Sequence, residues 1–81
     1  MKNKYTIDIS ALRKAMIDSD IFTVSELSRR SGVGRDTLSK IFGGKMLPSF
    51  DVAVKLSLAL SLTPEEAGEI FFVPNLREYV S

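Results

Sequence analysis

The chain has 81 residues, of which 44% are hydrophobic and 26% are charged. This length and composition are typical of one small globular domain and leave no room for separate catalytic and binding domains. Cysteine and histidine are both absent, which excludes a disulfide framework, the usual zinc sites and catalysis by an imidazole. No run of residues is long and apolar enough to span a bilayer, so we expect a cytoplasmic protein without a membrane segment.

The net charge of +1 hides an uneven distribution along the chain. Residues 1–28 are neutral, residues 29–55 have a net charge of +4, and residues 56–81 have a net charge of −3. A basic middle and an acidic end favour one side that faces a polyanion and another side that faces elsewhere. Chance scatter of surface charge explains the same numbers equally well, so the charge alone does not decide.

The first element is a short alternation of apolar and polar residues. Tyr5, Ile7 and Ile9 alternate with polar residues, which predicts a short strand, and an extended arm is the alternative. Ser10 can then cap a first helix. Its apolar positions have helical spacing; they are Leu12, Ala15 and Met16.

A second helix is predicted to begin after Thr23. Thr23 and Glu26 have the spacing of a capping box, and Phe22 and Leu27 have that of a hydrophobic staple. The helix should run to about Ser31. Glycine follows at position 32 and can supply the left-handed backbone conformation of a sharp turn.

Gly34 can cap a third helix, because glycine is tolerated at that position. The apolar side chains at i, i+3 and i+4 define its buried face; they are Leu38, Ile41 and Phe42. The outer face is left with Arg35, Asp36, Ser39 and Lys40. Gly43 and Gly44 should end this helix.

Ser49 is predicted to cap a fourth helix, which is apolar around much of its circumference and therefore expected at the centre of the core. Its expected inward residues are Ala53, Leu56 and Leu60. A fifth helix begins at Thr63-Pro64-Glu65-Glu66, a cap with proline at the first position. Its expected inward residues are Ala67, Ile70 and Phe71. Pro74 should end regular structure, and residues 75–81 have slight strand character in Leu76, Tyr79 and Val80.

Two short helices joined by a glycine turn describe a helix-turn-helix. Residues 22–66 resemble the phage Cro/repressor type of this domain, also called the XRE family, and the resemblance covers about residues 10–71. It is based on Thr23, Leu27, Gly32-Val33, Leu38, Ile41, Gly44-Lys45, Pro48-Ser49, Leu56 and Ala59-Leu60. It implies an all-α, compact five-helix bundle of the lambda-repressor-like type with short extended terminal segments. The domain would occupy residues 10–73 with the motif at about 23–43, between an arm at 1–9 and a tail at 74–81.

The resemblance also implies where the domain contacts DNA. The third helix would enter the major groove with its first residues at the base edges. The base-contacting positions implied are Arg35, Asp36, Thr37, Ser39 and Lys40. The phosphate-contacting positions implied are Thr23, Gly34, Gly43 and Lys45, the last with the amides near the glycine pair. The alternative for Arg35 and Lys40 is a solvated surface.

The chain departs from the family pattern at two places. Val24 stands where the family often has a glutamine that binds the DNA backbone. An arginine of the first helix and a glutamate of the third often form an ion pair, and here the matching positions are Ile17 and Phe42. We therefore predict that these two apolar side chains touch.

The leading prediction is a small bacterial, phage or mobile-element transcriptional regulator that binds double-stranded DNA without a ligand domain or cofactor. A protein-interaction module on the same fold, an antirepressor or modulator of a repressor partner, is the alternative. An enzyme is not expected, because no spacing places a base beside a nucleophile. The apolar ends around Ile7 and Phe72 either pack on the bundle, pairing as strands, or form a homodimer interface.

Overall fold

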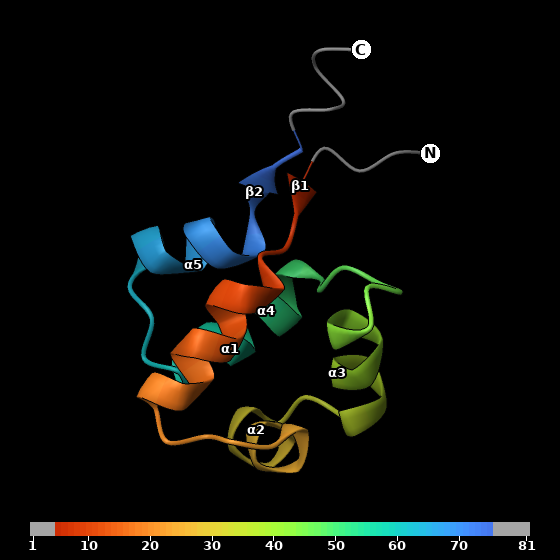
Figure 1. The fold of residues 1–81 in the computed structure, drawn as a ribbon, viewed down its shortest axis with the longest axis vertical. Helices are drawn as coiled ribbons and strands as arrows, with labels where there is room; N and C mark the ends of the chain where they lie inside the picture. Colours follow the sequence, from red (N-terminus) through yellow and green to blue (C-terminus); the bar gives the residue numbers. More distant parts are fainter. Residues whose placement is uncertain (1–4, 76–81) are drawn as a thin grey trace.

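Five helices follow one another along residues 5–75, the part of the chain that the computed structural model describes, with a short strand at each end (Figure 1). The all-α prediction of a five-helix bundle with extended terminal segments is confirmed. The elements are β1 (Tyr5–Thr6), α1 (Ile9–Asp18), α2 (Val24–Ser31), α3 (Arg35–Phe42), α4 (Phe50–Ala59), α5 (Pro64–Phe71) and β2 (Val73–Pro74).

Three of the helices begin at the hydroxyl residues that the sequence predicts. The side-chain oxygens of Thr23, Ser49 and Thr63 each accept a hydrogen bond from the backbone amide three residues later, at 3.1, 3.2 and 3.2 Å. At Thr63 the capping box is complete, because the carboxylate of Glu66 also accepts from the Thr63 amide at 2.8 Å. These bonds satisfy amides that have no partner inside the helix.

The start of α1 differs from the prediction. Asp8, not Ser10, is the capping residue, and its carboxylate accepts from the Ala11 amide at 3.0 Å. The Asp8 amide donates to the carbonyl of Ile70 at 2.8 Å, so a contact with α5 holds the chain at the point where the helix begins. The predicted strand is shortened to Tyr5–Thr6 because Ile9 is already helical.

The two ends of the described chain pair with each other. β1 and β2 are antiparallel, with Tyr5 opposite Pro74 and Thr6 opposite Val73, which confirms the prediction that the ends pair as strands on the bundle. Pro74 is the last residue of β2, and residue 75, the last that the structure describes, is outside any regular structure, as the sequence predicted. A two-residue edge ladder tolerates proline because few backbone donors are needed. The predicted strand character at Leu76, Tyr79 and Val80 lies outside the described residues.

One apolar core joins the helices, and within residues 5–75 it contains no buried polar side chain. α2 packs against both α3 and α4, and α5 packs against α1 and α4. Only one face of α4 is buried in the core, because Phe50 and Leu58 are exposed. The sequence predicted instead a helix that is covered on most sides. The buried hydrophobic residues are Leu12, Met16, Ile21, Leu27, Val33, Leu38, Ile41, Ala53, Leu56, Leu60, Ile70 and Phe71.

Candidate nucleic-acid interface

The turn between α2 and α3 is built around Gly32. Its φ of +79° is in the left-handed region, and its amide donates to the Ser28 carbonyl at 2.9 Å. The Ser31 hydroxyl donates to the Leu27 carbonyl at 2.6 Å and accepts from the Val33 amide at 3.1 Å. Val33 is buried, so the turn is attached to the core and sets the direction in which α3 leaves it.

α3 has one buried face and one exposed polar face, as predicted. Leu38 and Ile41 are fully buried and anchor the helix to the bundle, while Phe42 is half-buried. Gly34 is the capping residue and provides no side-chain hydrogen bond, which leaves the amides of the first turn without that partner. Among the predicted base-contacting residues, Thr37 is half-buried, and the exposed ones are Arg35, Asp36, Ser39 and Lys40.

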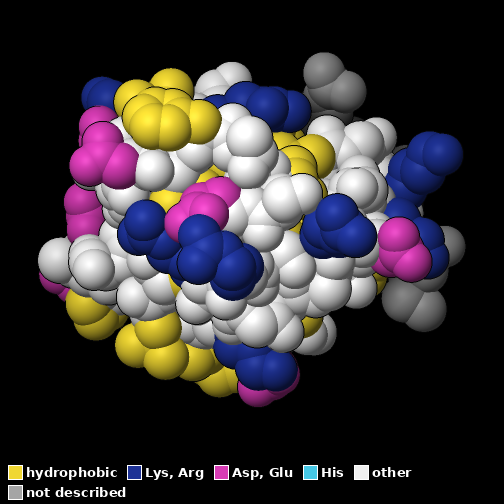
Figure 2. All heavy atoms as spheres, turned by 90° about the horizontal axis from the view of Figure 1, so that it is seen from below, with side chains coloured by type: hydrophobic (Ala, Val, Ile, Leu, Met, Phe, Trp, Pro, Cys, Tyr) yellow, Lys and Arg dark blue, Asp and Glu magenta, His cyan; other side chains and the backbone are white. Residues whose placement is uncertain are grey.

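The structure brings the start of α3 close to the start of α2. The Arg35 guanidinium lies 3.4 Å from the Ser25 hydroxyl, a long hydrogen bond that links the two helices. The Thr23 hydroxyl oxygen accepts from the Glu26 amide, and its own hydrogen is left to donate. Figure 2 shows Lys and Arg side chains scattered over the face that forms the lower end of Figure 1, where α2 lies, with hydrophobic side chains gathered toward the left.

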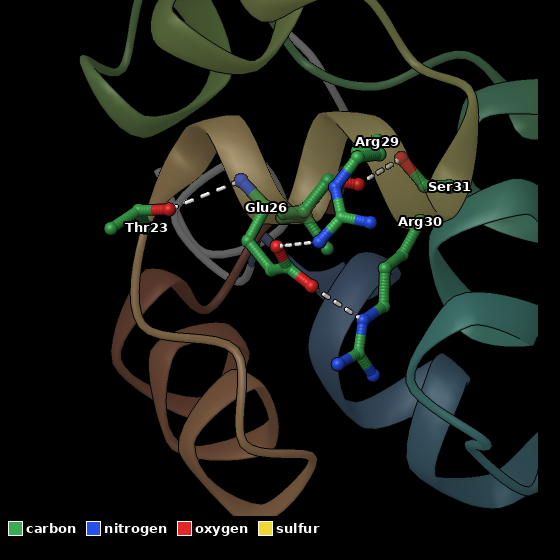
Figure 3. A network of polar contacts seen from close by, with 6 residues as sticks. Thr23, Glu26, Arg29, Arg30 and Ser31 are labelled. Atoms are coloured by element: carbon green, nitrogen blue, oxygen red, sulfur yellow. Dashed lines mark hydrogen bonds and ion pairs between the residues drawn. The ribbon is translucent and has the colours of Figure 1, made fainter.

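Glu26 joins two arginines of α2 into one network (Figure 3). Its carboxylate accepts from Arg29 and, at 2.7 Å, from Nε of Arg30. The hydrogen bond from Arg29, followed by that from Arg30, holds the pKa of the Glu26 carboxyl below its ordinary value of 4.5. The carboxylate is thus occupied by the arginines, and the reciprocal half of the predicted capping box at Thr23 is replaced by these ion pairs.

The predicted hydrophobic staple before α2 is also wrong. Phe22 is 71% exposed, whereas a staple would cover it against the fully buried Leu27. Leu27 is instead enclosed by the core, so its side chain is not available to the residue before the cap.

The turn after α3 differs from the predicted phosphate clamp. The amides of Gly43, Gly44 and Lys45 donate to carbonyls of α3 at 2.9, 3.1 and 2.8 Å, so they are already used within the molecule. Gly44 has a φ of +74°, which closes the turn. Of the predicted contacts of this segment, only the exposed side chain of Lys45 has no backbone carbonyl as its partner.

The far end of α3 is covered by an arginine that sequence reasoning missed. The guanidinium carbon of Arg13 lies 4.9 Å from the centre of the Phe42 ring, in the geometry of a cation–π contact. The predicted partner of Phe42, Ile17, is 58% exposed. The side chain found over Phe42 is thus that of Arg13, one helical turn before Ile17, and not the apolar partner that was predicted.

Comparison with known protein families decides the assignment. Residues 11–71 match the family described as the Cro/C1-type HTH DNA-binding domain. The chain belongs to this family. Membership supports DNA binding by a protein of the transcription-regulator type, and the resemblance noted in the sequence is confirmed. Comparison with curated proteins and with solved structures gives no match.

A cluster of acidic residues lines a groove of the Cro/C1-type domain away from α2 and α3. A groove of about 990 Å³ lies between α1 and α5, and its described lining includes no residue of α2 or α3. Its acidic residues are Asp8, Asp18, Glu65, Glu66 and Glu69. The groove therefore repels a polyanion, and this difference between the two faces favours DNA contact on the α2–α3 side.

Domains of this family are typically not enzymes. Within residues 5–75, no group of three or more carboxylate, histidine or cysteine side chains comes together in a way that could hold a metal ion. None of the helices in this part of the chain has the length and apolar character needed to cross a membrane.

Proposed function

We propose that this Cro/C1-type domain binds double-stranded DNA in a sequence-specific way, with α3 in the major groove, as a cytoplasmic regulator of transcription in a bacterium, a phage or a mobile element. It acts as a homodimer on a two-fold site. The proposed base-contacting residues are Arg35, Asp36, Thr37, Ser39 and Lys40. The proposed phosphate contacts come from the Thr23 hydroxyl, the amides that follow Gly34 and the side chain of Lys45.

The observation that carries the proposal is the exposed polar face of α3 on a helix anchored by two buried residues, Leu38 and Ile41. Such a helix can enter a groove without losing its contacts with the core. An arginine at its first position can donate two hydrogen bonds to guanine, and Lys40, one turn later, can reach a guanine or a phosphate. The uncapped amides at the start of α3 and the Lys45 side chain supply phosphate contacts that set the register.

The test is a fluorescence-anisotropy titration of a random-sequence duplex at two salt concentrations. A dimer that neutralises about six phosphates should give a log–log salt slope of about −5. Arg35→Ala/Lys40→Ala should weaken binding and make the slope shallower by about one for each phosphate that the variant no longer neutralises. A matched control is Lys14→Glu, which lowers the net charge by the same two units at α1, outside α2 and α3, and should bind nearly as well as the wild type.

Circular dichroism shows whether each variant is folded. Equal weakening by Arg35→Ala/Lys40→Ala and by Lys14→Glu would mean that net charge, not the face of α3, decides binding. A folded wild type that does not bind at low salt would contradict the proposal. Once a preferred duplex is selected, Arg35→Ala should lose about 10- to 100-fold discrimination at one base pair.

A second candidate is a protein-interaction module, and two observations favour it. Glu26 pairs with both Arg29 and Arg30, which reduces the free positive charge of α2. Val24 cannot donate a side-chain hydrogen bond to a phosphate. In that case a repressor is the partner, and DNA binding is absent or does not depend on Arg35 and Lys40.

A further inference from the structure

α4 has an exposed apolar face in addition to its buried one. Phe50 is 73% exposed, Val54 is 39% exposed and Leu58 is 75% exposed. Their spacing of four residues places the three side chains in one row along the helix. The buried residues Ala53 and Leu56 take part in the core, so this row is a separate surface that the bundle does not cover.

The row continues onto the paired ends of the chain. The Phe72 ring lies 6.3 Å from that of Phe50 and 6.1 Å, edge to face, from that of Tyr5, and both Phe72 and Tyr5 are exposed. We call these five residues the α4 stripe: Tyr5, Phe50, Val54, Leu58 and Phe72. With roughly 200 Å² for a fully exposed aromatic side chain, the stripe exposes on the order of 500 Å², near the upper end for the largest apolar patch of a monomer.

The area and charge of the stripe suit a second copy of this chain. Covering it on both copies removes roughly 1,000 Å² from water, which is about the minimum size of a biological interface and is typical of a weak dimer. Asp51 and Lys55 each follow a residue of the row on α4 and pair with each other at 3.3 Å, so this flank of the row has no net charge that would oppose the approach of a second copy. An apolar row flanked by a paired acid and base offers no free positive charge to a polyanion.

The order of the side chains also suits a two-fold arrangement. An isologous interface must be complementary to its own reversed copy. The smallest of the three α4 side chains, Val54, is in the middle, so two helices can approach closely there, and Phe50 then lies beside the partner's Leu58. In such an antiparallel pair, the half of α4 that contains Asp51 faces the partner's half that contains Lys55. Opposite charges therefore meet across the axis.

We propose that the α4 stripe is a homodimer interface in which α4 of one copy crosses α4 of a second copy, antiparallel, at Val54. This inference rests on the homodimer of the proposed function, and it names the surface that forms it. It needs no DNA, so its test is separate from the binding titration.

The first measurement is sedimentation equilibrium of the full chain between about 1 and about 500 µM, the range in which a small interface should associate. The wild type should form dimers, and Leu58→Lys should raise the dissociation constant by about 100-fold or more, because the change occurs twice in each dimer. A lysine is compatible with the last turn of α4. The matched control is Phe22→Lys, which changes a similarly exposed apolar residue outside the stripe and should leave the dimer intact.

The second measurement uses the absence of cysteine from the chain. Val54→Cys should form a disulfide-linked dimer under mild oxidation, since residues at the crossing point lie within bridging distance. Phe22→Cys should not. A wild type that stays monomeric at about 500 µM, a dimer unaffected by Leu58→Lys, or a dimer that Val54→Cys does not link would each overturn the proposal. A confirmed dimer that fails to bind DNA would overturn the proposed function and leave the interface standing.

Discussion

The glycine in the turn between α2 and α3 allows a test in which one substitution has opposite effects at two positions. An added Cβ at Gly32 or at Gly68 would meet no atom within 4 Å. The two sites therefore differ in backbone conformation and not in crowding. Gly32 has a φ of +79°, whereas Gly68 lies within the helix α5.

The magnitudes follow from the backbone. At Gly32 the left-handed conformation costs an alanine about 1–2 kcal/mol, while the stiffer unfolded chain returns about 0.4–1 kcal/mol. The net effect of Gly32→Ala is a loss of about 1 kcal/mol. At Gly68 the helical backbone suits alanine, so Gly68→Ala should gain about 0.5–1 kcal/mol.

The assay is thermal and urea unfolding followed by far-ultraviolet circular dichroism. For a domain of this size a change of 1 kcal/mol moves Tm by about 4–8 °C, so the two variants should lie on opposite sides of the wild type. A Gly32→Ala variant as stable as the wild type would refute the argument that the turn needs a left-handed residue. Destabilisation by Gly68→Ala would refute the claim that open space surrounds that position.

Two further predictions concern side-chain contacts of α2 and α3, the helices of the candidate DNA interface. In a double-mutant cycle of Arg13→Ala and Phe42→Leu, the cation–π contact should give a coupling of about 0.5–1 kcal/mol in urea unfolding, and a coupling of zero would remove it as a support of α3. The lowered pKa of Glu26 means that its ion pairs stabilise the folded state above pH 4.5 and lose that effect as the pH falls through the folded pKa. The difference in stability between wild type and Glu26→Gln should therefore be largest near neutral pH and shrink toward pH 3, and a difference that does not change with pH would contradict this reasoning.

The starts of α2, α4 and α5 could be predicted because each depends on residues close in sequence. Thr23, Ser49 and Thr63 cap the backbone amide three residues later, and that pairing needs no distant partner. The start of α1 was missed because two nearby residues, Asp8 and Ser10, both have capping side chains. In the structure, the Asp8 amide also donates a hydrogen bond to the Ile70 carbonyl of α5. Because Ile70 is far away in the sequence, no pattern of neighbouring residues predicts this bond at the start of α1.

In the candidate site, too, the features set by neighbouring residues could be predicted, and those set by distant contacts could not. The exposed face of α3 follows from its periodicity, and Arg35 and Lys40 lie where the sequence predicted them. The glycine amides after α3 were expected to bind phosphate, yet they close the turn on α3 itself. The role of Arg13 was missed because its partner, Phe42, is 29 positions away in the sequence, and an arginine on the outer face of a helix has no local mark that separates it from other solvated cations.

The sequence by itself determined where most helices begin, where the chain turns between α2 and α3, and which face of each helix is apolar, because capping, φ preference and periodicity act within a few residues. The tertiary structure decided which apolar faces are covered. It left Phe22 and the row from Phe50 to Leu58 exposed, paired the two ends as strands, and put Arg13 over Phe42. Burial and contact depend on what lies opposite a side chain in space, and residues far apart in the chain supply that surface.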